Sequence, residues 1–292
     1  ILQSKNIHIR HCLFTHIIGI LLNSWSNYNI YINHTVIGNV YMHYYHTHKS
    51  PSMFTFQGNP NTFILNSIFT CIHGGIVIKS HPILSAQLST NKLVFIKSMF
   101  INNTSGTAGS SLHILNSTRV FFLGCRFIAN KAKREGSVSM TNVIDLSIQN
   151  SLYNSLVGGA IYIANTSNIM LDNLSILYNV GSTYGGGINV IQCNLLTIVR
   201  CHISNNKASR RGGGLRLYHC SKIQFVSSVV SNNFAGWKGA GIYCRGIFSF
   251  EIILSSFINN RLSAFDKGAA IYAEHTKNLT LLKTYILKSK LN

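Results

Sequence analysis

A short glycine-rich tetrad returns at a fixed interval through the second half of the chain. Four copies follow one another at intervals of 27 residues, and a fifth comes 29 residues after the fourth. The copies are Gly158-Gly159-Ala160-Ile161, Gly185-Gly186-Gly187-Ile188, Gly212-Gly213-Gly214-Leu215, Gly239-Ala240-Gly241-Ile242 and Gly268-Ala269-Ala270-Ile271. A constant period of this length is typical of a solenoid, in which each repeat is one structural unit stacked on the next.

Apolar residues recur at the same places in each period and mostly alternate with polar ones. The columns are Ile161, Ile188, Leu215, Ile242; Ile163, Val190, Leu217, Cys244; Ile169, Leu196, Ile223, Phe250; Leu171, Ile198, Phe225, Ile252; and Ile176, Ile203, Val230, Phe257. Alternation with a period of two is a strand pattern, and stacked strands lie about 4.8 Å apart. The sequence therefore predicts an all-β fold, a single-stranded right-handed parallel β-helix (solenoid) of about ten coils.

One column is asparagine in four successive periods. Its members are Asn179, Asn206, Asn233 and Asn260. Asparagine tolerates the left-handed backbone that a sharp corner needs, and stacked amides can hydrogen-bond along the axis. We therefore expect this column at one corner of the coil, and Gly159, Gly186 and Gly213 at the next corner.

The repeat continues upstream in a looser form, so we expect a single β-helix domain over residues 1–292, most regular over 158–285. Residues 40–62 are rich in histidine and aromatic residues and contain two of the three prolines, which predicts an irregular loop excursion. The chain opens at Ile1 without a leader pattern, and we expect a fragment or a protein whose signal peptide has been removed. No apolar segment approaches the roughly 18 residues of a membrane span.

The tetrads and a second motif together resemble repeats of a known family. The second motif is Phe100-Ile101-Asn102-Asn103, Phe127-Ile128-Ala129-Asn130 and Phe257-Ile258-Asn259-Asn260. The pair resembles the GGAI and FxxN repeats of polymorphic outer-membrane-protein passenger domains, and the chain more broadly resembles the pectin-lyase-like right-handed β-helix superfamily. The first resemblance implies adhesion at a cell surface. The second admits polysaccharide lyases and hydrolases as an alternative.

Acidic residues are too few and too scattered to suggest catalysis. Cleavage of an acidic polysaccharide on such a fold requires paired carboxylates or acidic residues that hold Ca²⁺. The six acids are Glu135, Asp145, Asp172, Glu251, Asp266 and Glu274, and no two share a column in adjacent coils. We predict no enzyme and no cofactor; the alternative is a carbohydrate-active enzyme that acts through Asp172, His202 or His219.

Other reactive residues give weak signals. The glycine tetrads lack the Lys and Ser or Thr of a nucleotide-binding loop. His43, His46 and His48 have metal-ligand spacing, but no cysteine or carboxylate lies nearby, and we expect no metal. Cys193 and Cys220 share a column; parallel side chains favour two free thiols, while a disulfide in an oxidising compartment is the alternative.

Positive charge is the most unusual bulk property, at +19 formally, and it gathers between the asparagine column and the next tetrad. The cations there are Lys131, Lys133, Arg134, Lys207, Arg210, Arg211, Lys238, Arg261 and Lys267, against Glu135 and Asp266. Stacking would align them as a stripe that attracts a linear polyanion. The alternative is that these charges only keep the turns soluble and stop sheets from pairing edge to edge.

These features predict a non-catalytic scaffold or adhesin, extracellular or at the cell surface, that binds glycans or proteins. We expect an acidic polysaccharide or a surface glycoprotein as the partner, and nucleic acid is disfavoured because no DNA- or RNA-binding motif occurs. Glycosylation sequons indicate a secreted glycoprotein. They begin at Asn33, Asn102, Asn103, Asn116, Asn165, Asn173 and Asn278.

Overall fold

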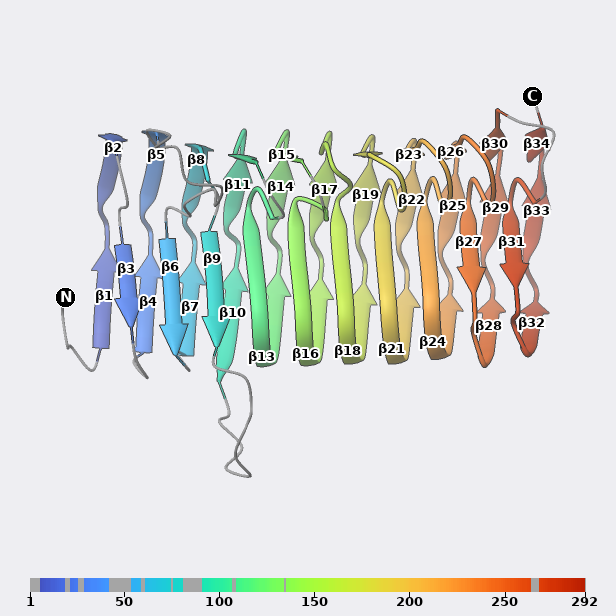
Figure 1. Cartoon of the computed structure of the whole chain (residues 1–292), viewed down its shortest axis with the longest axis horizontal. Helices are drawn as coiled ribbons and strands as arrows, with labels where there is room; N and C mark the ends of the chain where they lie inside the picture. The colour runs from blue at the N-terminus through green and yellow to red at the C-terminus, as the bar shows by residue number, and fades with distance from the viewer. Residues whose placement is uncertain are drawn as a thin grey trace.

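The computed structural model is a parallel β-helix whose strands stack along one long axis, with the two chain ends at opposite ends (Figure 1). It describes residues 6–18, 22–25, 29–41, 54–58, 61–74, 76–80, 91–106, 109–133, 135–263 and 268–291. Within these ranges the regular elements are all β-strands, and each paired strand is parallel to its neighbour. This architecture confirms the predicted all-β solenoid.

The largest sheet has sixteen strands and forms two faces of the coil, because its long strands bend at a residue with positive φ such as Asn165 or His219. Its strands are β1 (Asn6–Arg10), β3 (Leu22–Trp25), β4 (Asn29–Asn33), β6 (Phe54–Gly58), β7 (Asn61–Leu65), β9 (Ile76–Ser80), β10 (Lys92–Ile96), β13 (Leu112–Leu123), β16 (Val138–Gln149), β18 (Ile161–Asp172), β21 (Ile188–Val199), β24 (Leu215–Val226), β27 (Ile242–Arg245), β28 (Ser249–Ile253), β31 (Ile271–Glu274) and β32 (Asn278–Leu282).

The remaining sheets complete each coil. An eleven-stranded sheet consists of β2 (Leu13–Ile18), β5 (Val36–Tyr41), β8 (Ile68–Ile72), β11 (Met99–Ile101), β14 (Arg126–Ile128), β17 (Leu152–Asn154), β19 (Ser175–Leu177), β22 (His202–Ser204), β25 (Val229–Ser231), β29 (Ser256–Ile258) and β33 (Tyr285–Leu287). Two short sheets are β12 (Thr104–Ser105) with β15 (Lys131–Ala132), and β20 (Val180–Gly181), β23 (Lys207–Ala208), β26 (Phe234–Ala235), β30 (Arg261–Leu262) and β34 (Lys290–Leu291). Eleven stacked strands in one sheet are separated by ten turns, in agreement with the expected number of coils.

The predicted register is observed directly. Ile161 pairs with Ile188, Ile188 with Leu215, and Leu215 with Ile242. All four side chains are at most 1% exposed. The repeat therefore forms one continuous inward column, and burial of each such side chain stabilises the fold by about 1.5–3 kcal/mol.

A stack of aromatic rings continues the core towards the N-terminus. Neighbouring ring centroids along Phe69, Phe100, Phe127 and Tyr153 lie 5.0, 4.8 and 4.7 Å apart. Tyr153 is fully buried, and its hydroxyl has no hydrogen-bond partner. Burial, together with the nearby Cys125, raises the pKa of Tyr153 well above its usual range. This tyrosine occupies a position that phenylalanine fills in the three preceding coils.

Tyr153→Phe is expected to raise the free energy of unfolding by about 1 kcal/mol, because it removes a buried hydroxyl that gains no hydrogen bond. The shift in the midpoint of urea denaturation, followed by circular dichroism, measures the effect. Tyr285→Phe serves as the control, since Tyr285 is 65% exposed and should leave the midpoint unchanged. A lower midpoint for Tyr153→Phe would contradict the interpretation.

The asparagine column forms a buried hydrogen-bonded ladder. The Nδ2 atoms of Asn179, Asn206 and Asn233 each donate to the Oδ1 atom of the next asparagine, at 2.9, 3.0 and 3.0 Å. Each Oδ1 atom of Asn206, Asn233 and Asn260 also accepts from the backbone N–H of the preceding asparagine. The predicted amide stacking is therefore confirmed.

The prediction that these four asparagines adopt the left-handed conformation is wrong. Positive φ values belong instead to the residue before each ladder asparagine: Tyr178, Asn205, Asn232 and Asn259. The reason is that this preceding residue makes the corner, which turns the next side chain into the interior, where its amide is fully bonded. Exposure separates the two positions, because all four ladder residues are at most 1% exposed.

The glycine positions divide into two roles. Gly159 has the positive φ of 95° that the corner prediction implies. Gly186 and Gly213 do not, and the positive φ lies one residue earlier, at Gly185 and Gly212. A Cβ atom on Gly186 would come within 2.5 Å of the carbonyl oxygens of Gly213 and Lys207, so this glycine permits close packing of neighbouring coils.

The excursion predicted over residues 40–62 is narrower than expected. Val40 is buried in β5, while β6 and the start of β7 pair with strands of the neighbouring coils. Strands tolerate this composition here because the prolines do not fall within β6 or β7. Residues 42–53 and 59–60 lie outside the described residues.

Candidate binding surface at the basic corner

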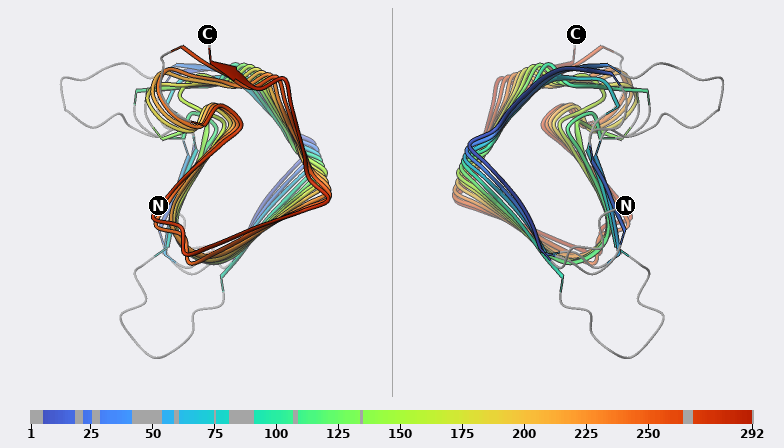
Figure 2. Two further views of the ribbon diagram at one scale, coloured as in Figure 1. Left: turned by 90° about the vertical axis from the view of Figure 1, so that its right-hand side faces the viewer. Right: turned by 90° about the vertical axis from the view of Figure 1, so that its left-hand side faces the viewer.

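The predicted basic residues lie at a corner where the chain bulges. Figure 2, viewed along the axis, shows this corner as a rounded lobe after which the chain turns inward to the next strand. We define the lobe as residues 182–187, 209–214 and 236–241, which connect the five-stranded sheet to β21, β24 and β27. Seven predicted cations are described: Lys131, Lys133, Lys207, Arg210, Arg211, Lys238 and Arg261. Arg134 and Lys267 lie outside the described residues.

The stripe of charge is broken. Successive residues in its outer ladder are Lys131, Val157, Val180, Lys207, Phe234 and Arg261. Val157 and Val180 are 42% and 43% exposed, so apolar surface separates the Lys131 side of the stripe from Lys207. Three ladder steps of about 4.8 Å place these two groups about 14 Å apart. The continuous stripe expected from stacking is therefore wrong, because the two intervening coils carry valine at this position.

Aromatic rings accompany the cations of the lobe. Arg211 lies over Trp237 and Tyr243, with its guanidinium carbon 4.3 and 5.1 Å from the ring centroids. The ammonium of Lys238 lies 4.8 Å from the centroid of Trp237 and 4.7 Å from that of Tyr272. Such contacts hold long cationic side chains in place while leaving their charge unneutralised. Sequence reasoning missed these rings because they come from different parts of the repeat.

The strands beside the lobe present a column of polar and aromatic residues. Tyr162, Asn189, Arg216, Tyr243 and Tyr272 are stacked in register. Alternation places this column on the outside, yet Tyr243 is fully buried and Arg216 is only 9% exposed. The lobe covers them. The sequence feature that could have indicated this burial is the mixture of Arg and Tyr in one outward column, because a fully solvated face does not require aromatic residues.

A cavity of about 340 Å³ lies between the lobe and this column. Its side chains come from the loop before β16, from β18, β21 and β24, and from the lobe. Those that bear polar groups are Glu135, Tyr162, Ser182, Thr183, Tyr184, Asn189 and Arg216. Backbone atoms of several glycines complete the wall, so the cavity follows from the same tetrads that close the coil.

The ion pairs between described residues do not include the corner cations. Across the described ranges, ion pairs join Arg200 to Asp172 at 2.6 Å, and Arg245 and His275 to Glu274 at 3.9 and 4.0 Å. None of these pairs includes any of the seven described corner cations. The described corner cations are therefore not neutralised by a close ion pair, although Arg211 and Lys238 are near enough to Glu274 to lower the pKa of that carboxyl.

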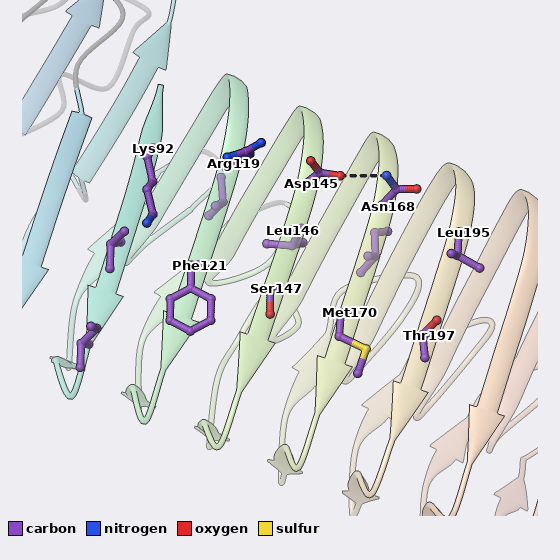
Figure 3. Close-up of a pocket in the computed structure, with 14 residues that line it drawn as sticks. Lys92, Arg119, Phe121, Asp145, Leu146, Ser147, Asn168, Met170, Leu195 and Thr197 are labelled. Atoms are coloured by element: carbon purple, nitrogen blue, oxygen red, sulfur yellow. Dashed lines mark hydrogen bonds between the residues drawn. The ribbon is translucent and has the colours of Figure 1, made fainter. Parts of the chain in front are cut away.

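A second hollow, of about 700 Å³, crosses the outer face of β10, β13, β16, β18 and β21 (Figure 3). Phe121 and Met170 contribute apolar surface to it. Asp145 is the one carboxylate in its lining, and it accepts a hydrogen bond from Asn168 Nδ2 at 2.8 Å. This hollow does not contain the two carboxylates that acid and base catalysis of glycoside cleavage uses.

The sequence also matches a known family. Residues 89–257 and 186–291 match the family described as the right handed beta helix region. The chain belongs to this right-handed β-helix family. Membership confirms the handedness predicted from the repeat, whereas the finer likeness to polymorphic outer-membrane-protein passengers stays a prediction. No curated protein matches the sequence.

Three solved β-helices are similar in structure at low sequence identity. The A-module of the mannuronan C-5 epimerase AlgE6 from Azotobacter vinelandii is 10% identical, with a TM-score of 0.32, over 89% of this chain and 91% of that one. The periplasmic alginate epimerase AlgG is 13% identical, with a TM-score of 0.33, over 94% and 76%. PfbA, a surface adhesin of Streptococcus pneumoniae, is 13% identical, with a TM-score of 0.38, over 100% and 86%.

The acidic residues and histidines considered for catalysis do not form a cluster among the described residues. In the described coils, no acidic residue is paired in register with another acidic residue. Asp172 is engaged with Arg200, His202 lies exposed on β22, and His219 packs edge-on against Tyr218 at 4.2 Å. Asp266 lies outside the described residues.

The remaining predicted sites are structural or lie elsewhere. Cys193 and Cys220 are paired in register and are buried free thiols; the contact with Cys220 and burial raise the pKa of Cys193. The described residues contain no cluster of three His, Cys, Asp or Glu side chains suited to a metal. His43, His46 and His48 fall outside them. A helix able to cross a membrane is not found in the described ranges.

Proposed function

We propose that the protein is a non-catalytic extracellular scaffold or adhesin that binds a linear acidic polysaccharide at its basic corner. The observation that carries this proposal is the absence of ion pairs among the seven described corner cations. The group that follows the break, from Lys207 to Arg261, places several cations on successive coils and attracts a chain of spaced anions.

Aromatic residues distinguish this proposal from the alternative in which the charges only maintain solubility. Solvated turns need no ring beside each cation, yet Lys207, Arg211 and Lys238 each lie over an aromatic side chain. Rings of this kind also offer flat apolar surfaces to the C–H faces of sugars. Cation and ring together suit a carbohydrate that bears acidic groups, and a surface glycoprotein with acidic glycans presents the same chemistry.

The location and the absence of catalysis are parts of the same proposal. The glycine tetrads and FxxN motifs, which resemble adhesin passenger repeats, support a cell-surface role. The dispersed carboxylates support binding without cleavage, since neither the cavity nor the second hollow brings two acids together in its lining.

The triple variant Lys207→Gln, Arg210→Gln, Arg261→Gln is expected to bind polygalacturonate and heparin fragments about tenfold more weakly, because each exposed ion pair contributes about 0.5 kcal/mol. These three side chains are exposed, so the fold should be unaffected. Isothermal titration calorimetry at two salt concentrations measures both the affinity and its salt dependence, and the wild type should lose affinity as salt rises.

A second triple variant is the matched control. Arg126→Gln, Lys222→Gln, Lys283→Gln removes the same charge from exposed positions outside the corner. Polysaccharide binding should change little in this variant. If both triple variants weaken binding equally, the attraction comes from net charge and the corner is not the site; if neither binds less, the proposed function is wrong.

A further inference from the structure

Arg216 is a buried cation without an acidic partner. It is 9% exposed, and its Nη1 atom donates a hydrogen bond to Asn189 Oδ1 at 3.0 Å. Its Nε atom is buried and has no partner. Burial lowers the pKa of Arg216, although a guanidinium remains protonated in proteins. A buried charge of this kind is costly unless an anion neutralises it.

The surroundings hold the guanidinium at the edge of the 340 Å³ cavity. Its central carbon lies 4.5 Å from the ring centroid of Tyr184 and 4.7 Å from that of Tyr218. These contacts and the bond to Asn189 fix the orientation of Arg216 before any ligand arrives. Pre-ordering of this kind reduces the entropy lost when a ligand binds.

The remaining lining residues restrict the kind of anion. Glu135 lines the cavity, and burial together with this carboxylate raises the pKa of Tyr162. The carboxylate of Glu135 repels multiply charged anions such as phosphate, but it can accept hydrogen bonds from the hydroxyl groups of a ligand. Tyr162 and Tyr184 add aromatic surface, and Asn189 and Thr183 add polar groups. A ligand with one negative charge and several hydroxyl groups satisfies this set.

One lobe position contributes a small side chain to the cavity wall. Backbone hydrogen bonds stack Thr183, Arg210 and Trp237 in successive coils, from Arg210 N to Thr183 O and from Trp237 N to Arg210 O. Two coils beyond Thr183, the equivalent residue is Trp237, whose indole packs on Arg211. Thr183 itself lines the cavity, where a side chain as large as an indole would take up much of the space. The volume of the cavity, near the lower end of ligand pockets, suits one sugar residue.

We propose that this cavity is a subsite for a single uronic acid residue, whose carboxylate pairs with Arg216 while its hydroxyl groups face Glu135, Asn189 and Thr183. The proposal rests on the proposed function, in that the residue belongs to the acidic polysaccharide held at the basic corner. The subsite provides what the exposed cations do not, which is selection for a carboxylate-bearing sugar over other anions.

Titration with methyl galacturonide, methyl galactoside and inorganic phosphate tests the subsite, with binding followed by NMR shifts of the protein. Methyl galacturonide should bind at least tenfold more tightly than the neutral galactoside or phosphate. Arg216→Gln should weaken methyl galacturonide binding about tenfold or more, since a charge-assisted hydrogen bond is lost. Its thermal midpoint should not fall, because a buried unpaired charge is removed; a lower midpoint together with unchanged binding would show a merely structural arginine.

Thr183→Trp should abolish methyl galacturonide binding without altering any charge, and it keeps the test decisive should Arg216→Gln fold poorly. The triple variant Lys207→Gln, Arg210→Gln, Arg261→Gln should retain that binding, because none of its three side chains lines the cavity. If the triple variant weakens polysaccharide binding but methyl galacturonide does not bind to the wild type, the subsite is overturned and the proposed function stands. Methyl galacturonide binding that survives Thr183→Trp would likewise place the site elsewhere.

Discussion

Asn206→Ala is expected to lower the free energy of unfolding by about 4 kcal/mol, since four buried hydrogen bonds worth about 1 kcal/mol each disappear. The lost bonds run from the N–H and Nδ2 of Asn179 to Asn206 Oδ1, and from Asn206 Nδ2 to the carbonyl of Ile176 and to Asn233 Oδ1. The groups left behind are buried and cannot turn to water. Urea denaturation followed by circular dichroism measures the loss.

Asn205→Gly is the matched control for Asn206→Ala, because it changes the neighbouring asparagine, which lies at the corner and outside the ladder. Asn205 has a φ of 56° and is only half-buried, and glycine adopts this conformation without strain. Its denaturation midpoint should stay the same or rise slightly. Equal destabilisation by the two variants would show that the corner, and not the amide ladder, carries the stability.

Gly213→Ala should destabilise the protein by about 3 kcal/mol, the upper range for overpacking by one methyl group. An added Cβ would lie 2.7 Å from the carbonyl oxygen of Ala240 and still closer to that of Phe234. Both obstacles are backbone atoms of the next coil, so relief requires two coils to separate. A fall in the thermal midpoint, and faster amide hydrogen exchange in residues 234–241, are the expected readouts.

Gly124→Asn distinguishes this packing role from a general intolerance of glycine substitution. Gly124 has a φ of 63°, but the nearest atom to an added Cβ is Lys97 Cγ at 3.6 Å. The same corner carries Asn150 and Asn173 in the next two coils, where Asn173 Nδ2 donates to Asn150 Oδ1 at 2.7 Å. An asparagine at position 124 should extend that pair and leave stability nearly unchanged. A loss as large as that of Gly213→Ala would refute the role of close packing.

The interior of the fold could be predicted from the sequence because it depends on repetition. A column such as Ile161, Ile188, Leu215 and Ile242 fixes both the strand period and the register, and the structure reproduces its pairing. The amide ladder was predictable for the same reason. The exact corner residues were not, because Asn205 and Asn206 are chemically identical and only the direction of the backbone decides which one turns inward.

The candidate site was only partly predictable. The exposed cations Lys207, Arg210 and Arg261 followed from their place in the repeat. The burial of Arg216 did not, since alternation predicts an outward residue and the covering lobe is an irregular loop. Contacts such as that between Arg211 and Trp237 join different coils at positions that no single repeat displays. Loop geometry, not strand periodicity, therefore determines the chemistry of this surface.

The ladder of Thr183, Arg210 and Trp237 has a consequence for how such a protein can change. These three residues lie in the first half of the lobe, whereas the tetrad glycines that pack one coil against the next end it and the ladder asparagines precede the five-stranded sheet. Replacing the side chain at the Thr183 position of the lobe can change a pocket at one level without altering the stacked interior. Ligand preference can thus diversify coil by coil along a solenoid whose folding energy is held elsewhere.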